Sequence, residues 1–365
     1  MNTITLGIDL AKHVFAACEL DRSGRVLRRR EFRRDGFAAW LHQLPAGTVV
    51  AMEACGSAHH WARRCREAGL APRLIAAHLV TPFRKSAAGK NDRNDAEAIA
   101  TAARQGNMRF VAIKSVDQQA RLAGHRVREG YKTEAIAIAN RLRGLLAEFG
   151  VVIAQSDAAL RRVLTDPDAL SELPGSMRNL LDDLHQHWQA VVQRVRACDA
   201  RIGQQARADD ACRRLQQITG VGPLTADAFV ATVGDTRLFA NGRQLAAWLG
   251  LVPGQHSSGG KHRLGAITGR GDSYLRTLLI QGARSSWLRA RAVPHEQATP
   301  EQRWIAHLCT RMPFGKVLVA IANKHARQMW AMLARDEAYD PHAWLRHPMV
   351  QRPKPKRRQP SALAA

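Results

Sequence analysis

Residues 3–32 read TITLGIDLAKHVFAACELDRSGRVLRRREF, and this stretch decides the fold of the N-terminal part of the chain. Three runs rich in apolar and β-branched residues are separated by short polar stretches, the second of which is the turn sequence DRSG at residues 21–24. Connections this short join antiparallel neighbours, so the stretch predicts a three-stranded meander.

Helix and strand signals alternate in the residues that follow the meander. We expect a helix over residues 36–43 capped by Asp35, a strand at residues 48–53, a helix from Ser57 to near Gly69, a strand at residues 72–77, and a helix over residues 94–106 closed by Gly106. Asp and Ser are favoured before a helix, and glycine is favoured after one. The order β-β-β-α-β-α-β-α predicts an α/β domain with a mixed sheet that ends near residue 110.

Beyond this sheet the pattern becomes purely helical. Ser115 is placed to cap a long helix that reaches Phe149, and Gly150 is placed to end it. A second long helix follows the break LPGS at residues 173–176, and its apolar residues alternate steps of three and four: Leu181, Leu184, Trp188, Val191, Val195, Cys198 and Ile202. Such a seam predicts either one arm of an intramolecular helical hairpin or a coiled-coil contact between two copies of the chain.

A third helical unit begins near Leu215. Its sequence ITGVGPLTADAFVATVG, residues 218–234, places a Gly-Val-Gly turn between two helical stretches, as in a helix-hairpin-helix. Backbone amides at Gly220 and Gly222 are therefore candidate phosphate contacts. The tail QRPKPKRRQP, residues 351–360, is rich in proline and basic residues, which predicts a disordered electrostatic arm.

Positive charge dominates the composition. The 365 residues include 55 Lys and Arg against 31 Asp and Glu, a formal charge of +24. This excess predicts a polyanionic partner, nucleic acid first, because neutralised phosphates release counterions; an anionic membrane surface is the rival. No apolar run reaches the roughly 18 residues of a membrane span, and the N-terminus lacks a signal-peptide pattern. The six scattered cysteines predict reduced cytoplasmic thiols and argue against a zinc site.

Four acidic residues are placed where strand ends and a helix start can meet. Asp9 ends the first expected strand, Glu53 ends the fourth, and Asp92 and Asp95 lie at the start of the next helix. Each acid alone fits an ordinary structural role. Together, in this order and in a basic protein, they predict a site for Mg²⁺, which prefers oxygen ligands. Two such ions about 4 Å apart stabilise the attacking and leaving oxygens of a phosphoryl displacement.

Residues 255–276, QHSSGGKHRLGAITGRGDSYLR, combine paired serines and five glycines with several basic side chains. The basic residues include Lys261, Arg263, Arg270 and Arg276, which are candidate phosphate contacts. A serine hydroxyl is a weak nucleophile unless a base or a metal activates it. The residues alone therefore favour a flexible loop in which Ser257 and Ser258 only hydrogen-bond a phosphate.

Several ordered blocks of the chain resemble the transposases of insertion sequence 110, a family that includes the Piv-type DNA invertases. The blocks are GIDLAK (7–12), MEACGS (52–57), KNDRNDAEAIA (90–100), ITGVGPLTADAFVATVGD (218–235) and the stretch from residue 239 to residue 284. The resemblance implies a RuvC-like, RNase-H-type domain at residues 1–112, a coiled-coil-like helical spacer at 113–212, a helical transposase domain at 213–345 and a basic tail at 346–365.

The resemblance also implies the site. The DEDD carboxylates of the family correspond to Asp9, Glu53, Asp92 and Asp95, which would bind two Mg²⁺ ions, with Mn²⁺ as a substitute. The catalytic serine of the family precedes a glycine, which selects Ser258. Where family members commonly read S-K-R-G after the isoleucine, this chain reads TGRG at residues 268–271, so that Gly269 replaces the usual lysine. Either a phosphate contact is absent here, or Arg270 substitutes for the lysine.

The implied function is that of a DNA transposase and site-specific recombinase in the bacterial cytoplasm, associated with the nucleoid. Its implied partners are donor and target DNA, a structured bridge RNA encoded by the same element, and further copies of the chain in a dimer or tetramer. Two alternatives stay open: a RuvC-like nuclease or junction resolvase that uses water, and a nucleic-acid-binding protein without catalysis.

Overall fold

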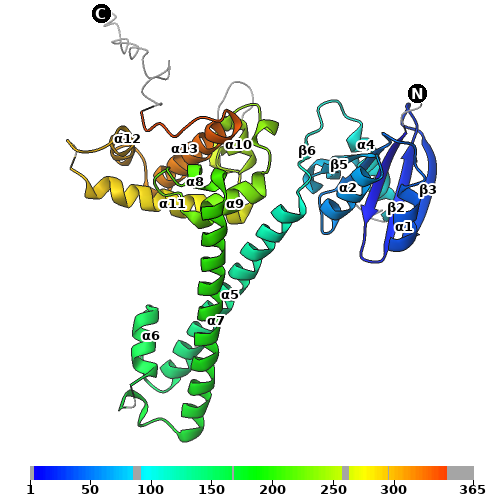
Figure 1. Cartoon of the computed structure of the whole chain (residues 1–365). Coiled ribbons are helices and arrows are strands. Elements are labelled where there is room, and N and C mark those ends of the chain that lie inside the picture. Colours follow the sequence, from blue (N-terminus) through cyan, green and yellow to red (C-terminus); the bar gives the residue numbers. More distant parts are fainter. Residues whose placement is uncertain (1–3, 85–91, 167, 257–262, 295, 343–365) are drawn as a thin grey trace, which may run out of the picture. The chain divides into compact units, whose positions relative to one another are not determined.

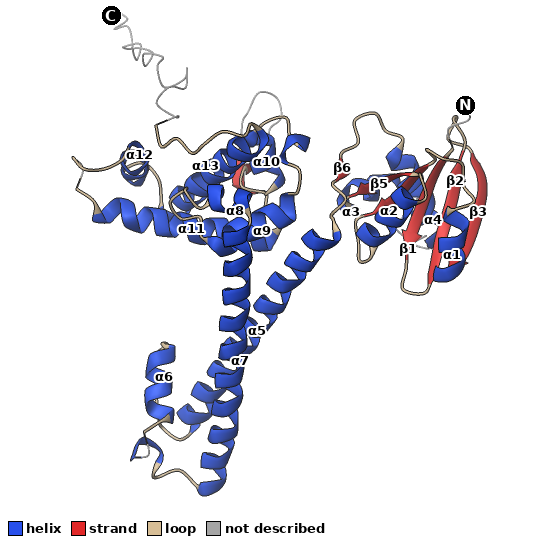
Figure 2. Ribbon diagram, viewed as in Figure 1, coloured by secondary structure: helices blue, strands red, loops and turns tan. Residues whose placement is uncertain are grey.

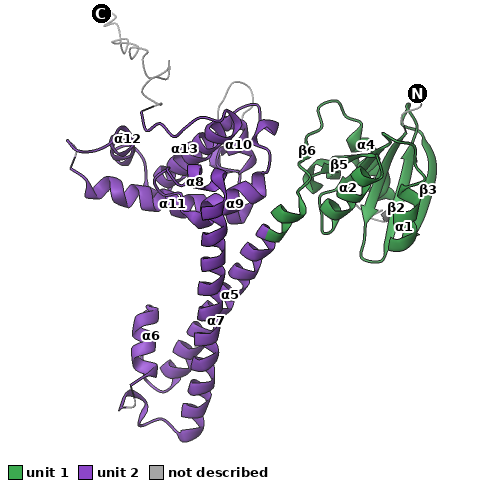
Figure 3. Ribbon diagram, in the orientation of Figure 1, with its two compact units in different colours: residues 1–120 green, residues 121–365 purple. Residues whose placement is uncertain are grey.

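The computed structural model describes residues 4–84, 92–166, 168–256, 263–294 and 296–342 (Figure 1). The chain forms two compact units, residues 1–120 and 121–365 (Figure 3). The first unit holds a six-stranded sheet with helices, and the second is built mainly from helices (Figure 2). None of the described helices is both long enough and apolar enough to cross a membrane.

The sheet of the first unit has the order β3-β2-β1-β4-β5-β6. Its strands are β1 (Thr5–Leu10), β2 (Val14–Leu20), β3 (Val26–Arg33), β4 (Val49–Glu53), β5 (Ala71–Ile75) and β6 (Phe110–Val111). Strands β1, β2 and β3 pair antiparallel, which confirms the meander. Strand β1 also pairs with β4 in parallel, which confirms that the first and fourth strands are neighbours.

Helices cover both faces of this sheet. The helices are α1 (Arg34–Leu41), α2 (Ala58–Glu67), the short α3 (Ala77–Val80) and α4 (Asp92–Ala103), with a 3-10 turn, η1 (Thr81–Phe83), after α3. On the face of α1 and α2, Phe15, Phe37 and Trp61 meet edge to face in the apolar core. On the opposite face, α4 packs its alanines against β1 and β2.

Three expected helix signals in this unit are wrong in detail. Helix α1 begins at Arg34, so Asp35 lies in its first turn rather than before it. Ser57 does precede α2, but its backbone has φ of 67° and its hydroxyl makes no capping hydrogen bond. Helix α4 ends at Ala103 rather than at Gly106, because the amides of Arg104 and Gln105 turn back to carbonyls three residues earlier.

A helical hairpin is formed by α5 (Val116–Glu148), which begins in the first unit and continues into the second, and α7 (Gly175–Ala208). Between them lie α6 (Asp157–Leu164) and the 3-10 turn η2 (Asp168–Leu170). The Ser115 cap is confirmed, since its Oγ accepts from the amide of Gln118 at 3.0 Å. Gly150, with φ of 80°, follows the end of α5 as expected. The seam residues Leu181, Trp188 and Val191 share an apolar cluster with Leu142 and other residues of α5, so that part of the seam packs within the chain.

The remaining helices surround one apolar core. They are α8 (Asp210–Leu215), α9 (Pro223–Val233), α10 (Gly242–Trp248), α11 (Ser273–Ala292), α12 (Pro300–Cys309) and α13 (Phe314–Ala334), with the 3-10 turn η3 (Thr236–Leu238) before α10. A small antiparallel pair, β7 (Pro253–Gln255) and β8 (Leu264–Ile267), lies within the glycine-rich basic stretch. Part of that stretch is therefore strand rather than a flexible loop.

Candidate active site

Two of the predicted acids lie in matching positions at the ends of two neighbouring strands. Ile8 of β1 lies opposite Met52 of β4 in the parallel ladder, so Asp9 and Glu53 are the next residues along each strand. Alternate residues of a strand point to opposite faces, and Ile8 and Met52 lie in the core beneath α2. Asp9 and Glu53 are therefore placed on the face that α4 covers.

Gly7 lets α4 approach this face closely. A Cβ atom built on Gly7 would lie 2.1 Å from the carbonyl oxygen of Ala96 and 2.5 Å from the amide nitrogen of Ala100. The helix thus packs directly on the backbone of β1, two residues before Asp9. This contact sets the first turn of α4 beside the strand ends, and Asp95 in that turn is 7% exposed.

Replacing Gly7 by Ala is expected to lower the free energy of unfolding by about 3 kcal/mol, because the new methyl group meets backbone atoms that cannot turn aside. Urea unfolding of the full chain measures the change. Gly36→Ala is the matched control, since its Cβ meets nothing within 4 Å on α1. Equal stability of the two variants would contradict a close approach of α4 to β1.

Glu53 and Asp95 share one cation, the guanidinium of Arg84. The Nε atom of Arg84 lies 2.9 Å from Oδ1 of Asp95, and its Nη2 atom lies 3.4 Å from Oε2 of Glu53. Arg84 directly follows η1, so the chain between β5 and α4 supplies it. The structure therefore brings two of the four predicted acids together around a third side chain that the sequence did not single out.

The negative charges of Glu53 and Asp9 also act on the neighbouring thiol of Cys55. Partial desolvation, and then the charges of Glu53 and Asp9, raise the pKa of the Cys55 thiol. This places Asp9 and Glu53 within electrostatic range of one group. The fourth predicted acid, Asp92, begins α4 one turn before Asp95, and its side chain lies outside the described residues.

The carboxylates fit a hard divalent cation in their donor chemistry, because such ions bind oxygen ligands and offset clustered negative charge. Within the part of the chain that the structure describes, no three acidic, histidine or cysteine side chains are already grouped to hold a metal ion. At this site the Arg84 guanidinium contacts the oxygens of Glu53 and Asp95 instead.

The predicted serine lies elsewhere in the sequence, between β7 and β8. Ser257, Ser258 and Lys261 are outside the described residues. The residues that flank this segment lie next to each other, since the amide of His256 donates a hydrogen bond to the carbonyl of Arg263 at 2.9 Å.

The other predicted basic contacts differ in their surroundings. Arg263 and Arg270 are exposed. Arg276 is half-buried, and its Nη1 donates to the carbonyls of Leu249 at 3.1 Å and of Arg270 at 3.0 Å. Gly269 has φ of 62°, a left-handed conformation that a lysine adopts only with strain. The glycine thus suits the local backbone at the position where the family pattern has lysine.

The two glycines of the predicted hairpin turn also differ. Gly220 has φ of 87°, and a Cβ built on it would lie 2.2 Å from the carbonyl oxygen of Gly282 on α11. It therefore has a packing role, which the sequence did not indicate. Gly222 immediately precedes α9, and a Cβ there would meet nothing within 4 Å.

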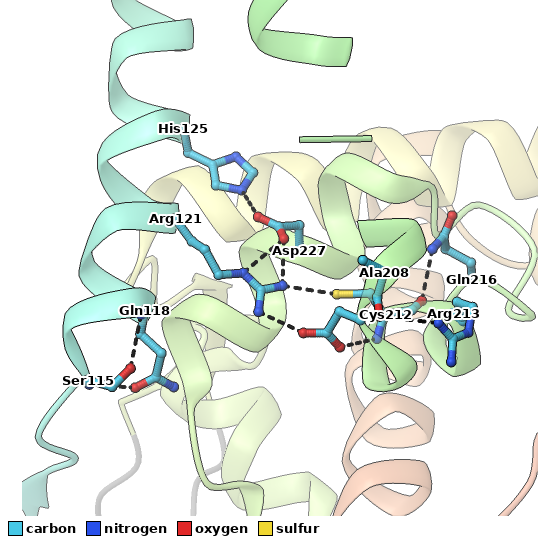
Figure 4. Close-up of polar contacts among 10 residues, drawn as sticks. Ser115, Gln118, Arg121, His125, Ala208, Cys212, Arg213, Gln216 and Asp227 are labelled. Atoms are coloured by element: carbon cyan, nitrogen blue, oxygen red, sulfur yellow. Dashed lines mark hydrogen bonds and ion pairs between the residues drawn. The ribbon is translucent and has the colours of Figure 1, made fainter. Parts of the chain in front are cut away.

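The second unit contains a buried polar cluster that the sequence did not predict (Figure 4). Arg121 and His125, both on α5, reach Asp227 on α9: Nε of Arg121 donates to Oδ1 at 3.0 Å, and Nε2 of His125 lies 2.9 Å from Oδ2. Arg121 also donates to Asp209 at 2.7 Å. Burial opposes ionisation, but the bonds from His125 and Arg121 hold the pKa of Asp227 below its usual value. The cluster fastens α5 to the C-terminal helices.

The mixed sheet of the first unit, with helices on both faces, is consistent with the DEDD class of transposases, and the comparisons agree with that class. Residues 6–151 match the family profile for DEDD transposases of the IS110 type, described as "Transposase", and residues 212–298 match "Transposase IS116/IS110/IS902 family". Membership of this class implies a DNA-cutting and rejoining enzyme that depends on a divalent metal.

Full-length relatives extend the match to most of the chain. A "Probable family 20 transposase" of Pseudomonas aeruginosa is 44% identical over 93% of this chain and 100% of its own length. The "Transposase for insertion sequence element IS1111A" of Coxiella burnetii is 38% identical over 92% of this chain and 90% of its own. The corresponding protein of IS1328 from Yersinia enterocolitica is 35% identical, over 93% and 99%. The chain belongs to the IS110 family of insertion-sequence transposases.

Proposed function

We propose that this transposase exchanges DNA strands with Asp9, Glu53, Asp92 and Asp95 as ligands of divalent cations and with Ser258 as the nucleophile. The observation that carries the proposal is the meeting of Glu53 and Asp95 around Arg84, beside the end of the strand that holds Asp9. Two carboxylates that meet at one point offer the oxygen ligands that a divalent cation prefers, and a DNA-cutting enzyme needs such an ion at the scissile phosphate.

The proposed chemistry conserves phosphate ester bonds. When bound, Mg²⁺ or Mn²⁺ would polarise the phosphate and favour ionisation of a nearby hydroxyl. Oγ of Ser258 gives up its proton and bonds to phosphorus, while the bond from phosphorus to the leaving strand oxygen breaks and that oxygen takes up a proton. A hydroxyl of the partner strand then attacks the phosphoserine and frees Ser258. Since one ester replaces another at each step, no ATP is consumed.

The proposed partners are donor DNA, target DNA and a bridge RNA encoded by the element. The charge of +24 supports a protein that holds several phosphate backbones at once. Pairing between RNA and DNA would choose the sequence, while the protein reads shape and backbone. We further propose the four-part division at residues 112, 212 and 345, and an oligomer in which the serine of one subunit meets the acids of another.

Trapping of a covalent adduct tests the serine. Wild-type protein incubated with DNA, RNA and Mg²⁺ is expected to yield a protein–DNA adduct that survives SDS, and Ser258→Ala is expected to yield none, because no other step links protein to DNA. Gel electrophoresis of labelled DNA measures this adduct. Ser257→Ala, the adjacent serine, is the matched control and is expected to retain it.

The same gel separates the proposal from hydrolysis. A metal-dependent nuclease or junction resolvase that uses water would cut DNA without an adduct, and Ser258→Ala would cut at the wild-type rate. That result would exclude Ser258 as the nucleophile while leaving the acidic site in place.

A further inference from the structure

Arg84 occupies a position where a divalent cation would be expected. Its guanidinium contacts Asp95 at 2.9 Å and Glu53 at 3.4 Å, and the three side chains are 29%, 10% and 20% exposed, in that order. A buried acid this close to another acid is stable only with a compensating cation. In this structure, Arg84 supplies that charge.

Arg84 does not form a bidentate pair with either acid. A bidentate arginine–carboxylate pair has two parallel hydrogen bonds to one carboxylate and is among the stronger hydrogen-bonded pairs. Here the guanidinium divides its contacts between two carboxylates, and the Glu53 contact is long. Among the described residues, the buried Nε of Arg84 has no partner in hydrogen-bond geometry, although Asp95 is at ion-pair distance. Such an arrangement is open to displacement by a stronger cation.

The oxygens that face Arg84 are those that a metal ion would need. Arg84 contacts one oxygen of each carboxylate, and a divalent cation held by the same two acids would be repelled by the neighbouring guanidinium. Arg84 and a metal ion therefore compete for Glu53 and Asp95.

We propose that Arg84 is an internal counter-cation of the acidic site, which competes with a divalent cation for Glu53 and Asp95. This rests on the proposed function of those acids as metal ligands. The competition keeps the acidic cluster stable without metal and weakens its affinity for divalent ions. Metal loading then weakens the contacts of Arg84 with the two carboxylates.

Metal binding by the full-length, metal-free protein tests this proposal. Free Mn²⁺ is titrated by electron paramagnetic resonance at constant ionic strength against wild type, Arg84→Gln, Arg84→Lys and Glu53→Gln. Arg84→Gln is expected to bind Mn²⁺ about tenfold or more tightly than wild type, because the competing charge is gone. Arg84→Lys keeps the charge and is expected to stay within about threefold of wild type.

A second half-buried arginine of the same unit gives the matched control. Arg73 on β5 donates to the carbonyl of Ala103 at 3.1 Å and lies over the ring of Phe110, so it does not touch the acids. Arg73→Gln removes the same charge from the protein and is expected to leave Mn²⁺ affinity unchanged. A tenfold gain in this variant as well would assign the effect to net charge and overturn the proposal.

Thermal melting gives a second readout, for which the concentration of free Mn²⁺ is not titrated. Without metal, Arg84→Gln is expected to melt at a lower temperature than wild type, because Glu53 and Asp95 lose their shared cation. Added Mn²⁺ is expected to raise its melting temperature more than that of wild type, since tighter binding gives more stabilisation. Equal shifts in both proteins would overturn the proposal.

The two hypotheses fail in different ways. If Glu53→Gln loses Mn²⁺ binding while Arg84→Gln binds as wild type does, the acids are metal ligands but Arg84 does not compete, and only the further inference fails. If wild type, Arg84→Gln and Glu53→Gln bind Mn²⁺ identically, the acids are not a metal site, and both hypotheses fail.

Discussion

Glu53→Gln is expected to lower the rate of DNA strand exchange by about a thousandfold or more, because a catalytic metal ion contributes several kcal/mol to the transition state and each 1.4 kcal/mol is a factor of about ten. The amide keeps the shape of Glu53 at the end of β4 but loses the charge that a cation needs. Asp95→Asn is expected to act in the same way from α4. Recombination of the element's ends in cells, scored by the frequency of joined product, measures the loss.

Glu19→Gln is the matched control for this loss. Glu19 lies on the neighbouring strand β2, is 16% exposed against 20% for Glu53, and pairs with Arg30 at 3.8 Å. Strand alternation puts it on the opposite face of the sheet from α4. Full recombination is therefore expected in this variant. If Glu53→Gln and Asp95→Asn also retained it, the acids would be ordinary structural residues, and a non-catalytic nucleic-acid-binding protein would be the better interpretation.

The placement of Asp9, Glu53 and Asp95 near one edge of the sheet was predictable, because it depends on local signals and on one topological step. Each strand of the meander is identified by its own apolar run, and short turns leave antiparallel pairing as the natural arrangement. Pairing of the first and fourth strands then brings Asp9 and Glu53 to one edge. Asp95 lies near the same edge because it is in the first turn of α4, which starts there.

Arg84 was not predictable by the same reasoning. It is 31 residues from Glu53 in the chain, and the contact depends on the path of the backbone through α3 and η1. The role of Gly7 was hidden for a related reason. A glycine inside an expected strand does not reveal which helix will press against it, although close approach of a backbone is a known reason for glycine at such a position.

Helix ends were the least accurate part of the prediction, since each depends on backbone geometry that residue type alone does not fix. Ser115 does accept the expected hydrogen bond, whereas Ser57 adopts a left-handed backbone and does not. Gly106 does not end α4, because the helix already stops at Ala103 and is followed by two tight turns at Arg104 and Gln105. Preferences at helix ends are worth about 1 kcal/mol, which tertiary contacts readily override.

The buried cluster around Asp227 gives the largest expected change in stability. Asp227 is 0% exposed, while Arg121 is 7% and His125 is 1% exposed. Asp227→Ala leaves the Arg121 charge buried with only Asp209 to offset it, and His125 loses its partner on α9. Breaking a buried pair from one side costs about 3–5 kcal/mol, and we expect a loss of that size.

Urea unfolding followed by circular dichroism of the helices measures this loss, with Asp210→Ala as the matched control. Asp210 lies at the start of the neighbouring helix α8 and makes an exposed pair with Arg213 at 2.9 Å. Exposed pairs contribute about 0–1 kcal/mol, so the control should change little. The double variant Arg121→Met with Asp227→Leu is expected to recover part of the loss, because the two most deeply buried charges of the cluster are both removed.

The pH dependence of the difference between wild type and Asp227→Ala identifies its electrostatic origin. The folded pKa of Asp227 is lowered, so its contribution to stability is fully present above the unfolded value of about 3.9 and is lost as the pH falls through the folded pKa. The stability gap is therefore expected to be constant near neutral pH and to narrow only in strong acid. A gap that failed to narrow in strong acid, or one no larger than that of Asp210→Ala, would show that packing rather than charge joins α5 to α9.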